Sequence, residues 1–462
     1  MFRKVNKVHF VGIGGIGMSG IAELLLNLGF SVSGSDLNDS EIIRNLRSKG
    51  AMIYEGHYAK NLGDCEVLVY SSAVPEDNPE LIAARGKNVP IIKRAEMLGE
   101  LIALKQTSIG VGGTHGKTST SSMIGALLSY AQLDPTLVVG GLVKNIDTNS
   151  QLGSGDIIVV EADEYDKSFL QLKPTISVIT NIEQEHMDCY DDLEDLHKSF
   201  AQFANAVPFY GAVLACLDSP GVQDIIPSIK RPVITYGFTS QADISAKNIQ
   251  SKGTKTTYSL YKQNQKCGKV TLNVPGKHNV LNSLAAAAIG FEMGLSAKTV
   301  IAGIGSYGGV RRRFEIKGIA GDVMVVDDYA HHPTEVSATL QAARDGWDRR
   351  IIAVFQPHLF SRTKSFYKEF AAAFMDSDVL IVTDIYPARE KPIKGVTGKL
   401  VSNAARSTGH KNVHYIPDLE NLQVSLDDII QENDMVITIG AGTIWRYGQS
   451  YFDHLINQEA AA

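Results

Sequence analysis

Cysteine is scarce in this chain, and its few copies form no pattern. Cys65, Cys189, Cys216 and Cys267 are the four cysteines among 462 residues, and no two of them form a CxxC pair. This excludes a disulfide framework and a cysteine-based zinc site, and is typical of free thiols in a reducing compartment. Long apolar runs are missing too: none approaches the roughly 20 residues of a membrane helix, and Gly12 interrupts the first run before it could serve as a signal peptide. We therefore expect a cytoplasmic protein without membrane insertion.

An excess of one charge is also absent. Lys and Arg number 44 against 50 Asp and Glu, for a net charge of −6, and the two signs are interspersed along the chain. Nucleic acids and anionic membranes require clustered Lys and Arg, so neither is an expected partner. At this length, beyond the roughly 250–300 residues where single cores stop growing, we expect several domains.

Short apolar strands alternate with helical patterns along nearly the whole chain, which predicts an α/β protein with mostly parallel sheets. We expect three domains, at residues 1–105, 106–310 and 311–462. The predicted strands are Val8–Ile13, Ser31–Asp36, Glu66–Ser72, Pro90–Arg94, Thr107–Gly113, Asp156–Asp163, Thr175–Ile182, Gly211–Asp218, Val323–Asp328, Ile351–Gln356, Val379–Asp384 and Met435–Gly440. The predicted helices include Gly17–Leu28 and His278–Met293, and Thr254–Tyr261 with Lys269–Val274 predict an antiparallel edge.

The first glycine loop has the form G-x-G-x-x-G between a strand and a helix. It is made by Gly12, Gly14 and Gly17, and Asp36 follows at the end of the next strand. Glycines let backbone N–H groups approach a pyrophosphate at the helix N-terminus, while Asp36 could accept a hydrogen bond from a sugar hydroxyl. Taken alone, the loop predicts a nicotinamide dehydrogenase, and it leaves open whether the diphosphate belongs to a cofactor or a substrate.

A second glycine loop carries the sharpest signal in the chain. Gly116, Lys117 and Thr118 end a variant P-loop between a strand and a helix, with Val111 where the strict motif has glycine. The loop would cradle ATP phosphates, Lys117 would neutralise their charge and the Thr118 hydroxyl would face Mg²⁺. Glu161 follows an apolar strand and is an ordinary Mg²⁺ ligand, whereas the imidazole of His186 is a less usual one.

Together these segments resemble the Mur ligases, which build the peptidoglycan precursor of the cell wall. The resemblance covers essentially the whole chain, in one order. Its segments are Gly12–Glu23 (GIGGIGMSGIAE), Ser71–Val74 (SSAV), Gly112–Thr118 (GGTHGKT), Glu161–Asp166 (EADEYD), His278-Asn279, Arg312-Arg313-Phe314, Asp327–Pro333 (DDYAHHP) and Phe355–Thr363 (FQPHLFSRT).

The resemblance implies three parts: a Rossmann-like N-terminal domain for a UDP-sugar, a central P-loop-type ATPase sheet, and a Rossmann-like C-terminal domain for an amino acid. The implied UDP-sugar residues are Gly12, Gly14, Gly15, Ile16, Gly17, Asp36, His57, Ser71 and Ser72. Those for ATP are Gly112, Gly113, Thr114, His115, Gly116, Lys117, Thr118, Asn279, Arg313 and Asp328. Thr118, Glu161 and His186 would bind Mg²⁺ or Mn²⁺, and Tyr329, His331 and Arg362 would bind the amino acid. The implied catalytic residues are Lys117, Glu161, His186 and His331.

Within the family, the motifs favour the branch that joins L-alanine to the lactyl carboxylate of UDP-N-acetylmuramate through an acyl phosphate, releasing ADP and phosphate. The alternative is a ligase of the same fold that recycles the cell-wall tripeptide onto the same sugar nucleotide. We expect the C-terminal domain to close over the other two, and a monomer or homodimer. Leu359 stands where some members carry arginine, so recognition of the amino-acid carboxylate would rest on Arg362.

Overall fold

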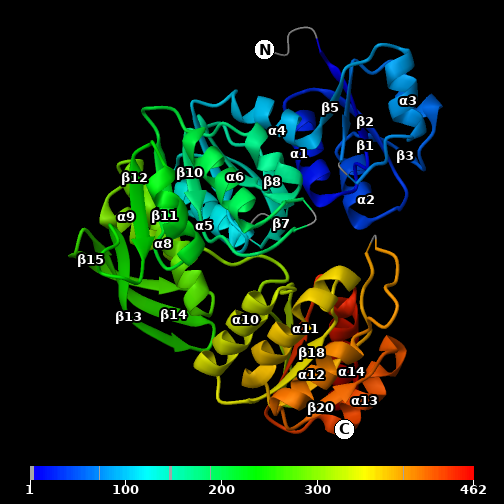
Figure 1. The fold of residues 1–462 in the computed structure, drawn as a ribbon, viewed down its shortest axis with the longest axis vertical. Helices are drawn as coiled ribbons and strands as arrows, with labels where there is room; N and C mark the ends of the chain where they lie inside the picture. Colours follow the sequence, from blue (N-terminus) through cyan, green and yellow to red (C-terminus); the bar gives the residue numbers. More distant parts are fainter. Residues whose placement is uncertain (1–4, 72, 145–147, 188, 389, 462) are drawn as a thin grey trace. The chain divides into compact units, whose positions relative to one another are not determined.

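The computed structural model describes residues 5–71, 73–144, 148–187, 189–388 and 390–461. Figure 1 shows its ribbon, in which the chain forms two compact units. The first unit comprises Met1–Asn248, Tyr258–Thr271 and Leu281–Gly308, and the second comprises Ile249–Thr257, Leu272–Val280 and Gly309–Ala462. Across the described ranges, no helix combines the length and apolar character needed to cross a membrane.

The N-terminal sheet of the first unit has the strand order β3-β2-β1-β4-β5, and its neighbouring strands run parallel. Its strands are β1 (Lys7–Val11), β2 (Ser31–Asp36), β3 (Met52–Glu55), β4 (Val67–Tyr70) and β5 (Ile91–Lys93). This is a Rossmann-like order, in which the chain changes direction across the sheet between β1 and β4. Ligands of such sheets bind beyond the carboxyl ends of the strands at that crossover.

The helices around this sheet are α1 (Ile16–Asn27), α2 (Glu41–Ser48), α3 (Pro79–Gly86) and α4 (Arg94–Ile102), with the short 3-10 helix η1 (Ala59–Leu62). Local sequence explains where two of them begin. The Ser40 side chain accepts a hydrogen bond from the Ile43 amide at the start of α2, and Asn78 caps α3 ahead of Pro79 at the first helical position.

The central sheet, also in the first unit, has the order β15-β14-β13-β12-β11-β10-β6-β9-β7-β8. Its strands are β6 (Thr107–Gly112), β7 (Thr136–Val143), β8 (Thr148–Gln151), β9 (Ile157–Ala162), β10 (Ile176–Ile179), β11 (Ala212–Cys216), β12 (Val233–Gly237), β13 (Ile244–Lys252), β14 (Lys255–Lys262) and β15 (Gln265–Leu272). The helices of this segment are α5 (Lys117–Tyr130), η2 (Tyr165–Gln171), α6 (Leu193–Asn205), α7 (Pro220–Ile225), η3 (Ile226–Ser228), α8 (Lys277–Glu292) and α9 (Ala297–Gly305). The middle of the sheet is parallel, so β6, β9 and β10 end side by side.

The C-terminal sheet of the second unit has the order β16-β17-β21-β18-β19-β20. Its strands are β16 (Glu315–Ala320), β17 (Val323–Asp328), β18 (Arg350–Phe355), β19 (Val379–Val382), β20 (Val413–Tyr415) and β21 (Asp434–Ile439). Its helices are α10 (Pro333–Gly346), α11 (Phe360–Ala373), η4 (Phe374–Asp376), α12 (Lys399–Thr408), η5 (Leu419–Asn421), α13 (Leu422–Ile429) and α14 (Ile444–Ala461). Strand β16 is antiparallel to β17, and the other pairs are parallel.

Alternating apolar residues of the C-terminal strands fill two separate cores. Val326, Ala353 and Phe355 belong to one, and Val325 and Val354 belong to the other. Consecutive strand residues point to opposite faces of a sheet, so helices must cover both faces to bury them all. The near-continuous apolar runs in the sequence therefore follow from burial on both sides.

The structure confirms the predicted α/β class with parallel-rich sheets. Each predicted strand and helix overlaps an observed one within a few residues, and the β2 and β17 predictions have the observed bounds. The segments predicted as an edge are the neighbours β14 and β15 at one end of the central sheet. The sequence reading missed β3, β7, β8, β12, β13, β16 and β20, which are mostly short, polar or peripheral strands.

Candidate active site

The first glycine loop lies beyond the carboxyl end of β1, against the end of β2. Gly12 has a φ of +79°, which favours glycine, and its amide donates to the Ser35 carbonyl at 2.9 Å. The Gly14 amide donates to Asp36 Oδ2 at 2.8 Å. In this structure Asp36 therefore holds the loop itself, and its contact with a sugar hydroxyl stays a prediction.

The other predicted sugar-nucleotide residues are grouped around this loop. Gly15 precedes the first turn of α1, and Ile16 is the first residue of that helix. A methyl group at Gly17 would lie 2.9 Å from a guanidinium nitrogen of Arg94, and one at Gly12 would lie 3.9 Å from Cβ of Ser71. The absence of a side chain at Gly17 thus allows the close approach of Arg94, whereas Ser71 lies at ordinary contact distance from Gly12. Ser72 lies outside the described residues.

A buried carboxylate that the sequence reading missed supports the predicted residue His57. Glu80 is fully buried, and it accepts hydrogen bonds from Ser35 Oγ at 2.6 Å and Asn61 Nδ2 at 2.7 Å. It also faces His9 Nε2 at 3.2 Å. Burial alone raises the pKa of Glu80, but the hydrogen bonds with His9, Ser35 and Asn61 outweigh it and hold that pKa below its ordinary value.

His57 is joined to this network through Ser35. The Ser35 hydroxyl lies 2.8 Å from His57 Nδ1 while it donates to Glu80. The orientation of the imidazole is therefore set by a buried carboxylate two hydrogen bonds away. The signal in the sequence is weak, because Glu80 stands in the first turn of a helix, where acidic residues are common for other reasons.

The second glycine loop joins β6 to α5 and has the backbone that phosphate binding requires. Gly113 has a φ of +136° and Gly116 a φ of +81°, and Gly116 is the residue before the first turn of α5. A methyl group at Gly113 would lie 2.0 Å from Thr180 Oγ1. Val111, which departs from the strict motif, is a buried residue of β6, so a side chain is accommodated there.

The end of β10 holds this loop through several hydrogen bonds. Asn181 accepts from the amide of His115 at 2.8 Å and donates to the His115 carbonyl at 3.0 Å. Thr180 Oγ1 donates to the same carbonyl at 2.6 Å, and Thr114 Oγ1 accepts from the Glu183 amide at 2.9 Å. Thr180, Asn181 and Glu183 were not among the residues expected in the site, although they come shortly before the expected His186.

Asn282 of α8 is a further residue that the sequence reading missed. Thr120 of α5 donates its hydroxyl to Asn282 Oδ1 at 3.1 Å. The same amide oxygen would lie 2.7 Å from a methyl group at Gly116. Helix α8 thus abuts the start of α5, and only a glycine at position 116 allows this approach.

Lys117, at the first turn of α5, faces acceptors from the loop and from the segment after β9. Its ammonium donates to the Gly113 carbonyl at 2.6 Å and to Glu164 Oε2 at 2.7 Å. Burial disfavours the ammonium, but the charges of Glu164 and Asp163 outweigh it, so the pKa of Lys117 lies above its ordinary value. Lys117 therefore stays cationic, as a phosphate ligand must.

Glu161 and Thr118 are brought together as expected. Glu161 lies in β9 beside the glycine loop, and its Oε1 accepts from the Gly140 amide of β7 at 2.7 Å. Burial raises the pKa of Glu161, opposed by hydrogen bonds from Gly140 and from the Thr118 hydroxyl. A half-buried carboxylate next to a hydroxyl is a ready pair of hard oxygen ligands for Mg²⁺.

His186 lies near the unpredicted Glu164, the carboxylate that pairs with Lys117. The distance from His186 Nε2 to Glu164 Oε1 is 3.9 Å, and His186 has a φ of +55°. Glu164 Oε1 is buried and has no hydrogen-bond partner among the described residues. An imidazole nitrogen and an unsatisfied acidic oxygen at this spacing fit a divalent cation.

In the second unit, the predicted residues Arg313 and Asp328 interact electrostatically. Asp328 is buried at the end of β17, where it accepts from the amides of Phe314 at 2.7 Å and Ala330 at 2.8 Å. Burial raises the pKa of Asp328 to about 6, against the attraction of Arg313. Asn279, also in this unit, donates to the Pro275 carbonyl at 2.8 Å.

Glu335 in the first turn of α10 connects Arg313 to the predicted amino-acid residues. It lies 3.6 Å from Arg313 and 3.3 Å from His331 Nδ1. The rings of Tyr329 and His331 meet edge to face at 5.3 Å, and Arg313 lies over the Tyr329 ring at 5.4 Å. The sequence reading missed Glu335.

Arg362 reaches this group through a second missed residue, His358. A guanidinium nitrogen of Arg362 lies 3.4 Å from His358 Nδ1, and the rings of His358 and His331 are 5.9 Å apart. Leu359, between them, has a φ of +69° at the start of α11, so it serves a turn of the backbone. Tyr329, His331 and Arg362 therefore belong to one cluster of the second unit.

A glycine loop at a helix N-terminus, with a lysine, a hydroxyl and carboxylates at adjacent strand ends, defines an α/β protein that binds nucleotide phosphates. Comparison with family models extends this along the chain. The Mur ligase family catalytic domain matches residues 7–106, the Mur ligase middle domain matches 111–290, and the Mur ligase glutamate ligase domain matches 312–442.

Individual relatives agree with the family models. The UDP-N-acetylmuramate–L-alanine ligase of Salinibacter ruber is 49% identical over 99% of this chain and 97% of its own. The UDP-N-acetylmuramate–alanine ligase structure from Thermotoga maritima has a TM-score of 0.83 at 28% identity, covering 98% of this chain and 99% of that one. The murein peptide ligase structure from Psychrobacter arcticus shares the fold, with a TM-score of 0.72 at 24% identity over 98% and 99% of the two chains.

The chain belongs to the Mur ligase family and is an ATP-dependent ligase. The family predicted from the sequence motifs is thereby confirmed.

Proposed function

We propose that this enzyme joins L-alanine to the lactyl carboxylate of UDP-N-acetylmuramate, giving UDP-N-acetylmuramoyl-L-alanine, ADP and phosphate in peptidoglycan precursor synthesis. The observation that carries the proposal is the convergence of Lys117, Thr118 and Glu161 beside one phosphate loop, in a chain whose full-length relatives are named for this reaction. The tripeptide-recycling ligase, the alternative reading, is not favoured by these relatives.

The phosphoryl step requires charge neutralisation. A carboxylate oxygen attacks the γ-phosphorus, the bond to the ADP oxygen breaks, and an acyl phosphate forms, so two anions must approach one another. We assign Gly112–Thr118 to the phosphates and Lys117 to the developing charge, because its half-buried ammonium is paired with Glu164 and stays protonated. Asn279, Arg313 and Asp328 are assigned to ATP as well, on the strength of the matching motifs.

Thr118, Glu161 and His186 are proposed as ligands for Mg²⁺ or Mn²⁺. The fit rests on the half-buried Glu161 carboxylate beside the Thr118 hydroxyl, and on the unsatisfied Glu164 oxygen that faces His186. When bound, such a cation supplies Lewis-acid stabilisation of the phosphoryl oxygens. We assign Glu164 to the positioning of Lys117, through its 2.7 Å ion pair.

Bond formation requires a neutral amine aimed at the acyl carbon. The amine attacks, phosphate leaves from the tetrahedral intermediate, and the amine proton must be taken up. We propose that Arg362 binds the amino-acid carboxylate and that Tyr329 orients the amine. His331 would accept the proton, with Glu335 at 3.3 Å to stabilise the imidazolium that forms.

The remaining assignments are also proposals. Gly12, Gly14–Gly17, Asp36, His57, Ser71 and Ser72 would hold the UDP-sugar, and the domain boundaries would fall at residues 105/106 and 310/311. The enzyme would act in the cytoplasm, where ATP is available. Its small-molecule partners would be UDP-N-acetylmuramate, L-alanine and ATP.

Phosphate release from purified enzyme tests the proposal. ATP, Mg²⁺ and UDP-N-acetylmuramate are supplied with L-alanine, with the tripeptide, or with neither. We expect release only with L-alanine, its loss in Lys117→Ala, and its retention in the exposed-site control Lys198→Ala. Release that depends on the tripeptide and not on L-alanine would assign the chain to the recycling reaction instead.

A further inference from the structure

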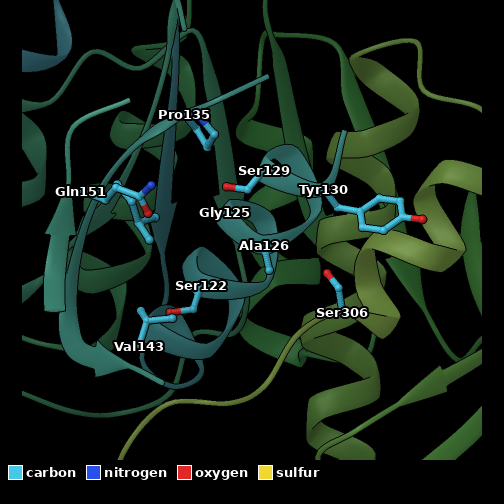
Figure 2. A pocket seen from close by; sticks show the side chains of 10 residues that line it. Ser122, Gly125, Ala126, Ser129, Tyr130, Pro135, Val143, Gln151 and Ser306 are labelled. Atoms are coloured by element: carbon cyan, nitrogen blue, oxygen red, sulfur yellow. The ribbon is translucent and has the colours of Figure 1, made fainter. Parts of the chain in front are cut away.

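A cavity of about 200 Å³ lies in the first unit, against the helix that follows the phosphate loop. Its lining residues come from α5, from β7 and β8, and from the end of α9 (Figure 2). They are Ser122, Gly125, Ala126, Ser129, Tyr130, Pro135, Leu137, Val143, Gln151 and Ser306. Figure 2 shows Gln151 and Pro135 on one side of α5 and Tyr130 and Ser306 on the other.

The side chains that line the cavity determine which kind of ligand it can bind. Among the described residues that line the cavity, each side chain is uncharged, so a phosphate or carboxylate would find no counter-charge. The apolar surface comes from Ala126, Pro135, Leu137 and Val143, and hydroxyl and amide groups are interspersed with it. A somewhat smaller cavity, of roughly 150 Å³, is enough to bind benzene. The space therefore suits a small ring compound with a neutral polar substituent.

Ser122 supplies an independent sign of a ligand. Its side chain is 1% exposed, and its Oγ has no hydrogen-bond partner in the described part of the chain. The neighbouring Ser121 shows what a helical serine ordinarily does, since its hydroxyl donates to the Lys117 carbonyl at 2.9 Å. Buried hydroxyls almost always have a hydrogen-bond partner, so we expect a bound ligand to supply one to the Ser122 hydroxyl at the cavity wall.

Two walls of the cavity are continuous with the phosphate site. Ser122 stands four residues after Thr118, on the same face of α5, at a rise of about 6 Å along the helix. On the other wall, Leu137 and Val143 belong to β7, whose Gly140 donates its amide to Glu161. A ligand here would touch α5, which carries Thr118, and β7, whose Gly140 amide holds Glu161 of β9.

We propose that this cavity is a regulatory site for a small, uncharged ring compound with an amide or hydroxyl group, and that its occupancy changes the affinity for ATP through α5 and β7. The link to ATP rests on the proposed roles of Thr118 and Glu161, whereas binding at the cavity does not.

Benzamide and benzoate are a matched pair of probes, because they share a ring and a planar substituent but differ in charge. Calorimetry on the full chain should show saturable binding of benzamide in the millimolar range and at least about tenfold weaker binding of benzoate. Ala126→Leu fills the cavity and should weaken benzamide binding by at least about tenfold. Ser122→Ala removes the unsatisfied hydroxyl and should weaken benzamide binding about fivefold, the effect of one hydrogen bond.

Ala201→Leu is the control, since Ala201 is also half-buried on a helix of the same unit but lies on α6. It should bind benzamide as the unaltered chain does. Saturating benzamide should shift the dissociation constant for ATP by at least about fivefold, and ATP should shift that of benzamide by the same factor. Equal benzamide binding in Ala126→Leu and in the control would overturn the site. Binding that leaves the ATP constant unchanged would overturn the regulatory role.

Discussion

Replacement of Gly113 by alanine should disable the phosphate loop without unfolding the chain. Gly113 has a φ of +136°, a conformation that residues with a side chain rarely adopt. An added methyl group would lie 2.0 Å from Thr180 Oγ1, whereas ordinary contact begins at 3.4 Å. The same methyl group would lie 3.0 and 3.1 Å from backbone atoms of Asn181, so the loop cannot relieve the clash by moving toward Asn181.

The size of the effect follows from these distances. The backbone strain costs about 1–3 kcal/mol. The shortfall in the contact distance is about 1.4 Å, so the loop amides must move by an ångström or more from the phosphate oxygens. A misplacement of that order lowers activity roughly 100-fold. We therefore expect kcat/KM for ATP to fall about 100-fold, with a small change in thermal stability.

Removal of the obstructing hydroxyl separates the clash from the backbone strain. Thr180→Ala alone loses the 2.6 Å hydrogen bond to the His115 carbonyl and should cost about fivefold. In the double variant the closest remaining contacts are near 3.0 Å, which shifts of a few tenths of an ångström relieve. The double variant should thus lose only about tenfold and be more active than Gly113→Ala.

Steady-state phosphate release at varied ATP measures all three variants. Gly86→Ala is the control, because a methyl group there meets nothing within 4 Å. Two results would refute the reasoning. One is a Gly113→Ala enzyme with unaltered kcat/KM for ATP. The other is a double variant as weak as the product of its single effects, which would mean that the Thr180 contact is not what displaces the loop.

Three further predictions concern the carboxylates of Glu80, Asp328 and Glu161. Glu80→Ala should lower the free energy of unfolding by about 3–5 kcal/mol because several buried donors lose their acceptor, and Glu80→Gln by less. The pKa of Glu80 is lowered in the folded state, so the ionised carboxylate stabilises the fold above pH about 4.5, and this stabilisation is lost as pH falls through the lowered pKa. Urea unfolding at several pH values should show this loss in the unaltered chain and not in Glu80→Gln. The pKa of Asp328 is raised to about 6, so the chain should lose stability as pH rises from about 4 to 6, and the melting temperature of Asp328→Asn should lack that fall. Glu161→Gln should slow turnover at least about 100-fold, and chelation of divalent cations should stop phosphate release until Mg²⁺ or Mn²⁺ is restored. Full activity of Glu161→Gln would remove Glu161 from the reaction, and full activity after chelation would remove the cation.

The phosphate loop was predictable because its chemistry is local. Gly116, Lys117 and Thr118 are consecutive, and the strand before them and the helix after them are set by the hydrophobic pattern. The same holds for the first glycine loop and Asp36, which joins it across adjacent strands. A short motif on a regular scaffold specifies both the backbone shape and the group it can bind.

Residues that act by packing against those motifs were not predictable. Glu80 reaches Ser35 across 45 positions, and Asn282 reaches Thr120 across 162. Neither stands in a recognisable motif, and an acidic or amide residue in a helix has many ordinary roles. The role of Glu335 was not predictable either, because the helix dipole alone explains an acidic residue in the first turn of a helix.

The sequence by itself determined the fold class, the two glycine loops and the family, because these depend on periodicity and on residues adjacent in the chain. Tertiary structure alone decided the partners of the loops: the β10 end that holds His115, the Glu164 carboxylate on Lys117, and the β7 amide on Glu161. It also decided that a cavity lies against helix α5, beside a serine whose hydroxyl has no partner among the described residues. Such contacts depend on how segments far apart in the sequence pack together, and no local sequence pattern specifies which distant segments meet.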